Sequence, residues 1–301
     1  MREARIYAST DVEVTGKTRV FGIIGDPVSH SLSPLFQSRF ALLHDIDAVY
    51  VALRVAEGQV ETALAGLWAL DVQGFNVTVP HKETVAGMVK LDGAAHQIGA
   101  VNTVRRGPDG WQGGNTDWQG VRDALLHLGA QLESAEVLLI GAGGTARAVL
   151  HALAKGGAGR VHICNRSPQR LQELMLHATD TYPDTEFCEL AWQKKDIEAV
   201  ALHCPLVINT TSIGLGEAGV EFPFAIDGKG VALDAVYSPD GQTPFVRAAV
   251  RGGRRVVDGL PMLLAQGAAS FDWWHGIRPD VASVMTWVEE RLGRCRADRS
   301  Q

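Results

Sequence analysis

The sequence contains few cysteines, and they are scattered. Four cysteines occur in 301 residues, as Cys164, Cys188, Cys204 and Cys295. None of them forms a CxxC pair, and no histidine pattern suited to zinc accompanies them. The spacing therefore predicts no metal site, and we expect reduced thiols in a cytoplasmic protein.

Long apolar runs and an excess of positive charge are also missing. No apolar run approaches the roughly 20 residues that span a bilayer. The start, MREARIYASTDVEV, lacks the apolar core of a secretory signal, and residues 1–13 are expected to form a short extension. The formal net charge of −6 argues against nonspecific nucleic-acid binding, which needs a basic surface. We expect a small-molecule partner, no nucleic acid and no membrane, and the sequence leaves monomer and homodimer open.

The length and composition suit two globular domains of the α/β class. In the first part, expected strands at 19–25, 48–55 and 74–80 alternate with expected helices at 35–44 and 59–71. Because strands and helices alternate, the sheet should be mainly parallel.

The second part has the pattern of a dinucleotide-binding domain. After an expected helix at 118–129, the strand 136–140 leads into a glycine cluster, a helix and the strand 160–165, which is a βαβ unit. Further strands are expected at 206–210 and 230–236. The helix after Asp258, with Pro261 in its first turn, should fold back onto the first domain, whose sheet otherwise lacks helices. We expect an N-terminal substrate domain (1–117 plus 259–301) and a Rossmann-like dinucleotide-binding domain (118–258).

The glycine cluster predicts a pyrophosphate site. Gly141, Gly143 and Ala146 satisfy G-x-G-x-x-A between a strand and a helix. The first glycine permits a tight turn, the second lets the backbone approach a pyrophosphate, and the small third residue lets helix and strand pack closely. Backbone N–H groups and the helix dipole would then bind the phosphates.

The residues after the next strand favour NADP over NAD. A site for NAD usually has an acidic residue there, whereas this chain has Asn165, Arg166, Ser167 and Arg170. Guanidinium groups bind a 2′-phosphate through charge-assisted hydrogen bonds. The alternative is that both arginines are solvated surface charges.

Polar side chains follow the expected strands of the first part, where ligands bind in open α/β sheets. They are Ser31, Ser33, Thr78, Lys82, Asn102 and Asp117. Lys82 could donate a proton to a carbonyl oxygen during reduction, and Asp117 could orient its ammonium. Thr78 and Asn102 suit ring hydroxyls, and the serines suit a carboxylate. Each residue alone has an ordinary alternative: a solvated lysine, or a helix cap at Ser33 or Asp117.

Taken together, the motifs resemble those of shikimate dehydrogenases. Their order and spacing over residues 19–275 are similar to that family: GDPVSHSLSP, GFNVTVPHKE, GAVNT, GNTD, GAGGTARA, NRS, INTTSIGL, DAVY and DGLPMLLAQGA. The resemblance implies NADPH-dependent reduction of 3-dehydroshikimate to shikimate, on the chorismate route to aromatic amino acids. It also implies two α/β domains with the active site in the groove between them.

The resemblance assigns roles to residues at matching positions. Lys82 and Asp117 match the catalytic pair. The positions that match substrate-binding residues are Ser31, Ser33, Thr78, Asn102, Tyr237 and Gln266. Those that match the NADP site are Gly141, Ala142, Gly143, Gly144, Thr145, Ala146, Asn165, Arg166, Ser167 and Arg170. Those that match the nicotinamide end are Thr210, Ser212, Gly259 and Leu263.

Three departures leave the substrate preference open. The segment Phe36-Gln37-Ser38 stands where many members carry His-Asn, and PLFQ looks more like the branch that also accepts quinate. Pro261 replaces a common glycine, and His81 replaces an aromatic residue. The alternatives are a quinate/shikimate dehydrogenase that uses NAD or NADP, and a non-catalytic NADPH-binding sensor. The presence of both Lys82 and Asp117 argues against the sensor.

Overall fold

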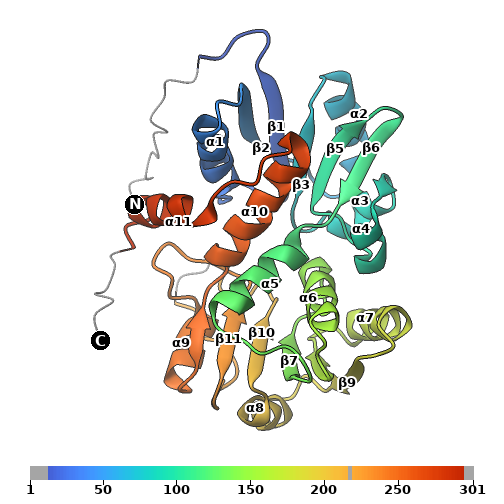
Figure 1. Cartoon of the computed structure of the whole chain (residues 1–301). Coiled ribbons are helices and arrows are strands. Elements are labelled where there is room, and N and C mark those ends of the chain that lie inside the picture. Colours follow the sequence, from blue (N-terminus) through green and yellow to red (C-terminus); the bar gives the residue numbers. More distant parts are fainter. Residues whose placement is uncertain (1–12, 216–218, 295–301) are drawn as a thin grey trace. The chain divides into compact units, whose positions relative to one another are not determined.

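The chain forms two compact units, each built on one six-stranded sheet (Figure 1). The computed structural model describes residues 13–215 and 219–294, so Cys295 and nearly all of the expected N-terminal extension lie outside the described residues. One unit combines the described parts of Met1–Asp92, Val101–Gly114 and Gly267–Gln301, and the other combines Gly93–Ala100 with those of Asn115–Gln266. The division into a substrate domain and a cofactor domain at residues 117 and 258 stays a prediction.

The sheet of the first unit is parallel at one side and carries a hairpin at the other. Its strand order is β2-β1-β3-β5-β6-β4. The strands are β1 (Arg19–Gly25), β2 (Ala48–Arg54), β3 (Gly74–Val77), β4 (Lys90–Leu91), β5 (Thr103–Gly107) and β6 (Gly110–Gly114). Strand β1 pairs in parallel with β2 and β3, while β5 is antiparallel to both β3 and β6. This hairpin was not predicted from the sequence, although Gly107-Pro108-Asp109-Gly110 is a strong turn signal.

The expected return of the C-terminal segment to the first unit is confirmed. The helices here are α1 (Ser33–Leu43), α2 (Val60–Ala69), α3 (Lys82–Ala86), the part of α10 (Leu260–His275) from Gly267 onward, and α11 (Val281–Arg291). A Cβ on Gly267 would lie 2.3 Å from the Phe36 ring, so only glycine allows α10 to approach α1 this closely. Gln37 Nε2 donates to the carbonyl oxygen of Gly267 over 3.0 Å.

The sheet of the second unit is parallel throughout, in the order β12-β11-β10-β7-β8-β9. Its strands are β7 (Glu136–Ile140), β8 (Arg160–Cys164), β9 (Glu186–Leu190), β10 (Leu206–Asn209), β11 (Val231–Asp234) and β12 (Arg255–Val257). Numbered from β7, this is the strand order of a doubly wound dinucleotide-binding fold, and the order reverses between β7 and β10. The predicted α/β class is confirmed.

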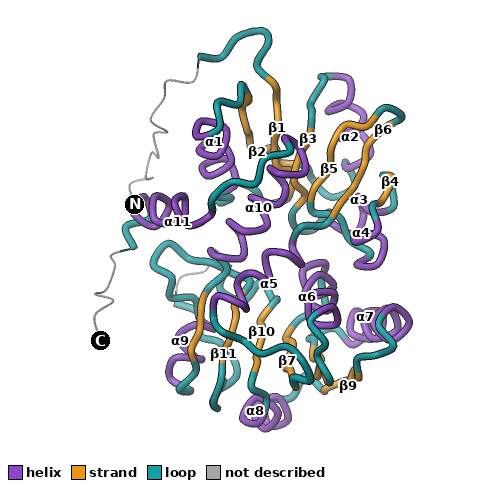
Figure 2. The backbone as a smooth tube through the Cα atoms, viewed as in Figure 1, coloured by secondary structure: helices purple, strands orange, loops and turns teal. Residues whose placement is uncertain are grey.

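Helices cover both faces of this second sheet (Figure 2). They are α5 (Asp117–His127), α6 (Gly144–Lys155), α7 (Pro168–Thr181), α8 (Lys194–His203) and α9 (Pro244–Arg251). A further helix of this unit, α4 (Gly93–Ile98), packs against α6 through Ile98. Val137 and Leu139 of β7 pack into a core that includes side chains of α6 and α7. Leu138 and Ile140 pack on the other face with side chains of α8 and α9. Because both faces are covered, β7 is a continuous apolar run rather than an alternating one. Among the described helices, none has the length and apolar character needed to cross a membrane.

Candidate active site

The carboxyl ends of β1 and β3 bring several predicted residues of the first unit together. Thr78 follows β3 directly, and its backbone N–H donates to the carbonyl oxygen of Ile24 over 2.9 Å. A Cβ on Gly25, the last residue of β1, would lie 2.3 Å from Thr78 Cγ2. The glycine therefore makes room for the threonine at this edge of the sheet.

Lys82 lies beside Asn102 in this unit. Lys82 is the first residue of α3, and its carbonyl oxygen accepts a hydrogen bond from Val101 N–H at 2.9 Å. The next residue, Asn102, accepts from Val77 N–H through its carbonyl oxygen at 2.8 Å. Lys82 is 9% exposed and Asn102 is 2% exposed. Since lysines are rarely buried to this degree, the alternative of a solvated surface lysine does not describe Lys82.

Ser31 and Ser33 lie at the start of α1. Ser31 Oγ accepts a hydrogen bond from the backbone N–H of Ser33 at 3.2 Å, and Ser33 is buried. The helix begins at Ser33 with Leu32 in the capping position, so the alternative role of Ser33 as the cap is wrong. Its side chain acts to lower the pKa of Tyr50, an effect smaller than that of burial.

A buried network missed by the sequence analysis supports this edge. The Tyr50 hydroxyl donates to Asn76 Oδ1 at 2.7 Å. Asn76 Nδ2 donates to the Asn102 carbonyl oxygen at 3.0 Å and to Ser270 Oγ at 2.9 Å. Burial raises the pKa of Tyr50 well above its usual value, so the phenol stays a neutral donor. An asparagine inside the otherwise apolar strand GFNV was the available signal, because a buried amide needs partners.

In the second unit, the start of α5 at Asp117 lies next to Gln266 of α10, because Thr116 contacts the Gln266 side chain. Asp117 is the first residue of α5 and is 4% exposed, and its N–H donates to Asn115 Oδ1 at 3.0 Å. Thr116, the residue before the helix, donates from Oγ1 to Gln266 Oε1 at 3.5 Å. Because Thr116 occupies the N-cap position of α5 and Asp117 is the first helical residue, the alternative role of Asp117 as the cap is wrong. An acidic side chain in the first turn also interacts favourably with the helix dipole.

The glycine turn has the geometry of a dinucleotide site. Gly141 has φ +114°, and a Cβ there would lie 2.5 Å from Thr210 Oγ1, so only glycine fits. At Gly143, which precedes α6, a Cβ would meet no atom within 4 Å, so the backbone is open to a ligand. Ala146 is fully buried. Gly141 directly follows β7 and Thr210 directly follows β10, at the point where the strand order reverses. This is where a doubly wound sheet binds a pyrophosphate.

The predicted ribose end follows β8. Asn165 Nδ2 donates to the Ser167 carbonyl oxygen at 3.0 Å, and Ser167 Oγ caps α7 by accepting from Arg170 N–H at 3.4 Å. Arg166 and Arg170 are exposed, and neither pairs with a carboxylate within residues 13–215 and 219–294. Their guanidinium groups are therefore accessible to a phosphate.

A second buried network fixes the loops that follow β10 and β11. Asn209 Nδ2 donates to Asp234 Oδ1 at 2.8 Å, and Asn209 Oδ1 accepts from both Thr211 N–H and Thr211 Oγ1. Asp234 also accepts from Val236 N–H at 3.0 Å and from Thr243 Oγ1 at 2.5 Å. Burial raises the pKa of Asp234 to about 7. This network fixes the loops that carry Thr210, Ser212 and Tyr237, and it was not predicted from the sequence.

The start of α10 lies against the same loops. Asp258 accepts from Ser238 N–H at 3.4 Å and from Leu260 N–H at 3.3 Å. A Cβ on Gly259 would lie 2.4 Å from the Ala235 carbonyl oxygen. Leu263 N–H donates to the Gly259 carbonyl oxygen at 2.8 Å. The residues expected at the nicotinamide end therefore occupy adjacent segments of the second unit.

One group of side chains in the second unit has metal-ligand types. The ligand atoms of Glu136, His162 and Cys204 all lie within 4.8 Å of one another. However, His162 Nε2 is 2.7 Å from Glu136 Oε1, and Arg160 Nη1 is 3.8 Å from the same oxygen. Burial raises the pKa of the Cys204 thiol to about 12, which opposes the thiolate that a metal requires. These contacts favour a hydrogen-bonded group, and the absence of a metal stays a prediction.

Three family models match this chain in succession. They are described as Shikimate dehydrogenase substrate binding domain (residues 23–104), Shikimate / quinate 5-dehydrogenase (124–211) and Shikimate 5'-dehydrogenase C-terminal domain (259–286). The chain belongs to the shikimate dehydrogenase family.

Individual members of the shikimate dehydrogenase family match most of the chain. Shikimate dehydrogenase (NADP(+)) of Geobacter metallireducens is 40% identical over 89% of this chain and 95% of that protein. The shikimate dehydrogenase structure from Aquifex aeolicus has a TM-score of 0.81 at 33% identity, covering 94% of this chain and all of that one. The Thermus thermophilus enzyme, solved with NADP(H) and shikimate, has a TM-score of 0.78 at 32% identity, covering 91% of this chain and 99% of that one.

The structure shows what the residues at all three departures contact. Phe36 is fully buried against Gly267, and Gln37 binds the Gly267 backbone, so both residues serve the packing of α1 on α10. Pro261 is the second residue of α10, where its missing N–H costs no helical hydrogen bond. His81 Nε2 lies 2.6 Å from the Val55 carbonyl oxygen and anchors the start of α3.

Proposed function

We propose that this chain catalyses the reversible, NADPH-dependent reduction of 3-dehydroshikimate to shikimate. The observation that carries the proposal is the burial of Lys82 beside Asn102 at the carboxyl edge of the first sheet. A buried lysine is costly to maintain, and at a strand end it is suited to proton transfer. Relatives named NADP(+)-dependent shikimate dehydrogenases support the choice of reaction.

Lys82 is the proposed proton donor. NADPH held at the glycine turn of Gly141–Ala146 would supply the hydride for the ring carbonyl carbon, and negative charge would then develop on the carbonyl oxygen. The Lys82 ammonium then gives its proton to that oxygen, so the product is a neutral hydroxyl and the lysine is left as an amine. In the oxidation direction the neutral amine accepts the hydroxyl proton. The resemblance assigns Asp117 as its catalytic partner.

The remaining polar groups of the first unit are proposed to bind the substrate ring and its carboxylate. The hydroxyls of Ser31 and Ser33 can donate to a carboxylate at the start of α1, where the helix dipole favours an anion. Thr78 and Asn102 are neutral groups that can bind ring hydroxyls. We assign Tyr237 and Gln266 to the same substrate on the resemblance alone.

The cofactor is proposed to be NADP. The turn at Gly141–Ala146 fits the pyrophosphate, and Arg166 and Arg170 offer the 2′-phosphate two accessible guanidinium groups. We assign Thr210, Ser212, Gly259 and Leu263 to the nicotinamide end. We also propose a cytoplasmic enzyme, monomeric or dimeric, in keeping with the free thiols of Cys164, Cys188 and Cys204.

The proposal is tested by initial rates with shikimate and with quinate, each against NADP and NAD. We expect the highest kcat/KM for shikimate with NADP. A higher kcat/KM for quinate would instead identify the chain as a quinate dehydrogenase. This alternative remains because the family matched over residues 124–211 includes both shikimate and quinate dehydrogenases. No turnover with any pair, together with NADPH binding, would favour a sensor.

A further inference from the structure

The first sheet ends on one side in a long, apolar strand. Strand β2 is the outermost strand of that sheet, and among the described strands it pairs with β1 alone. Its seven residues, AVYVALR, contain no proline and no glycine, and their one charge is at the last position. An edge strand of this kind is a template for pairing with another strand.

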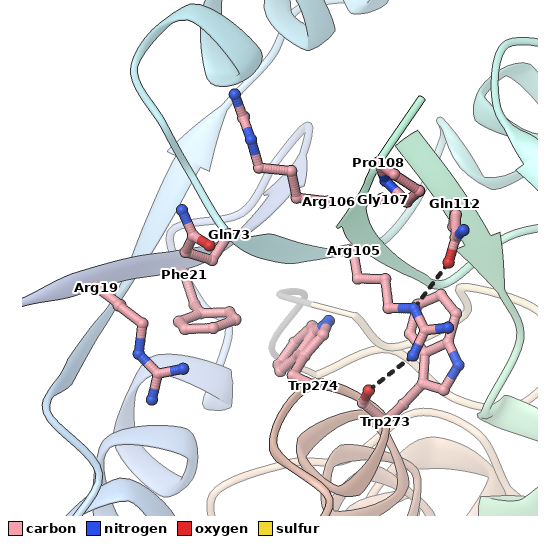
Figure 3. Close-up of a pocket in the computed structure, with 10 residues that line it drawn as sticks. All are labelled: Arg19, Phe21, Gln73, Arg105, Arg106, Gly107, Pro108, Gln112, Trp273 and Trp274. Atoms are coloured by element: carbon pink, nitrogen blue, oxygen red, sulfur yellow. Dashed lines mark hydrogen bonds between the residues drawn. The ribbon is translucent and has the colours of Figure 1, made fainter. Parts of the chain in front are cut away.

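The other three edges of the two described sheets are protected. Strand β4 has two residues and β12 has three, while β9 carries Glu186 and Glu189 within five residues. The strands beside β4 carry polar side chains that bind one another, and Arg105 Nε of β5 donates to Gln112 Oε1 of β6 at 2.9 Å (Figure 3). Since short strands and charged side chains discourage pairing, β2 differs from the other edges.

Half of the backbone groups of β2 point away from the sheet. At the start of the strand, the Asp47 carbonyl oxygen accepts from Arg19 N–H of β1 at 3.2 Å. Just past its end, Val55 N–H donates to the Gly25 carbonyl oxygen at 3.1 Å. Because successive residues of a strand point in opposite directions, the odd-numbered residues bind β1 and the even-numbered ones face outward. Their backbone groups have no hydrogen-bond partner among the residues that the structure describes, and they belong to Ala48, Tyr50, Ala52 and Arg54.

Apolar side chains accompany this free edge. Tyr50 packs in a core cluster with Phe21, so the odd-numbered residues of β2 lie on the opposite face of the sheet. There Val51, at the centre of the strand, is 38% exposed, and Val49 and Leu53 are half-buried. A strand that pairs with this edge would therefore also cover apolar surface.

We propose that β2 pairs antiparallel with β2 of a second copy of this chain, which joins the two six-stranded sheets. Pairing about a two-fold axis at Val51 places Ala48 opposite Arg54 of the second copy. It also places Tyr50 opposite Ala52 of the second copy. Each such pair exchanges two hydrogen bonds, which gives about eight across the axis. A typical protein interface has about ten direct hydrogen bonds, so this edge supplies most of that number.

The same seven residues complement themselves in this register. Val51 lies opposite its own copy and Val49 lies opposite Leu53, in the pairs that bring side chains closest. Asp47, at the acidic start of the strand, lies one position from Arg54 of the second copy, so opposite charges meet at both ends. A register shifted by two residues places Asp47 opposite Leu53 or shortens the pairing. This self-complementarity is the property of a two-fold interface between identical chains.

The test is the mass of the native chain as a function of concentration, measured by sedimentation equilibrium. We expect a dimer, and Val51→Lys should raise its dissociation constant by about 100-fold or more, because two ammonium groups would then lie opposite each other. Ala52→Pro removes an outward N–H and no bond to β1, so it should also weaken the dimer. Leu176→Lys adds the same charge at an exposed apolar position of α7 and should leave the mass unchanged.

Hydrogen exchange gives the local readout. The amides of Tyr50 and Ala52 should be protected in the native dimer and exchange rapidly in Val51→Lys, while the circular dichroism of both proteins should agree. If that substitution alters the fold, Ala52→Pro replaces it in the comparison.

Three outcomes would overturn the proposal. They are a native chain that stays monomeric at every concentration, a Val51→Lys chain as dimeric as the native one, and outward amides that stay protected in a monomeric variant. The last outcome would mean that another segment of the same chain covers the edge. This interface does not depend on the reaction proposed above.

Discussion

Replacing Asp234 with asparagine should remove a pH dependence of folding stability. The Asp234 side chain is fully buried, and burial raises its pKa to about 7, while its hydrogen bonds to Thr243, Val236 and Asn209 act in the opposite direction. In the unfolded chain the pKa is about 3.9. Asparagine resembles the protonated acid, since its oxygen can accept from Asn209 and Val236 and its amide can donate to Thr243.

The sign and size of the effect follow from proton linkage. Between the two pKa values the folded chain holds a proton at Asp234 that the unfolded chain has lost. The stabilisation is therefore fully present below about pH 4 and is lost as the pH rises through about 7. From about pH 5 to about pH 8, the native chain should lose about 3 kcal/mol of unfolding free energy relative to Asp234→Asn.

The assay is urea unfolding of both proteins at several pH values, followed by circular dichroism. The difference in unfolding free energy between them, obtained from the midpoints at a common slope, is plotted against pH. Asp240→Asn is the matched control, because Asp240 is exposed and its pKa is lowered, chiefly by the Ser238 hydroxyl. The control should leave the dependence between pH 5 and pH 8 unchanged. A flat difference for Asp234→Asn would refute the raised pKa.

Four further substitutions test the assigned residues. Lys82→Ala should lower kcat by about 100-fold or more with little change in substrate affinity, while the exposed Lys90→Ala should keep native rates; full turnover without Lys82 would remove it from the mechanism. Arg166→Ala should raise the KM for NADPH by about tenfold but not that for NADH, and an equal rise would contradict the 2′-phosphate assignment. Gly141→Ala should destabilise the fold by about 1–3 kcal/mol, because its φ is positive. Gly143→Ala should leave stability near native and weaken NADPH binding in titrations; the opposite pattern would contradict the turn geometry.

The second unit was largely predictable because its signals are local. EVLLI is a buried strand with the bounds 136–140 expected from its apolar run, and the glycine pattern placed the start of α6 at the end of that strand. Both signals depend on neighbouring residues, since a strand covered on two faces must be continuously apolar and a tight turn needs glycine. The first sheet was harder. The hairpin β5–β6 was missed because VRRG and WQGG carry weak alternation, despite the turn residues between them.

The sequence by itself determined the fold class, the glycine turn and the polar residues at strand ends, because each depends on residue type and short spacing. Only the tertiary structure decided which groups are buried and what they bind. Lysines are usually exposed, but Lys82 is buried in the folded chain. The hydrogen-bond networks around Asn76 and Asp234 join segments that are far apart in the sequence. Such partners are set by strand order and register, and these emerge only when the sheets assemble.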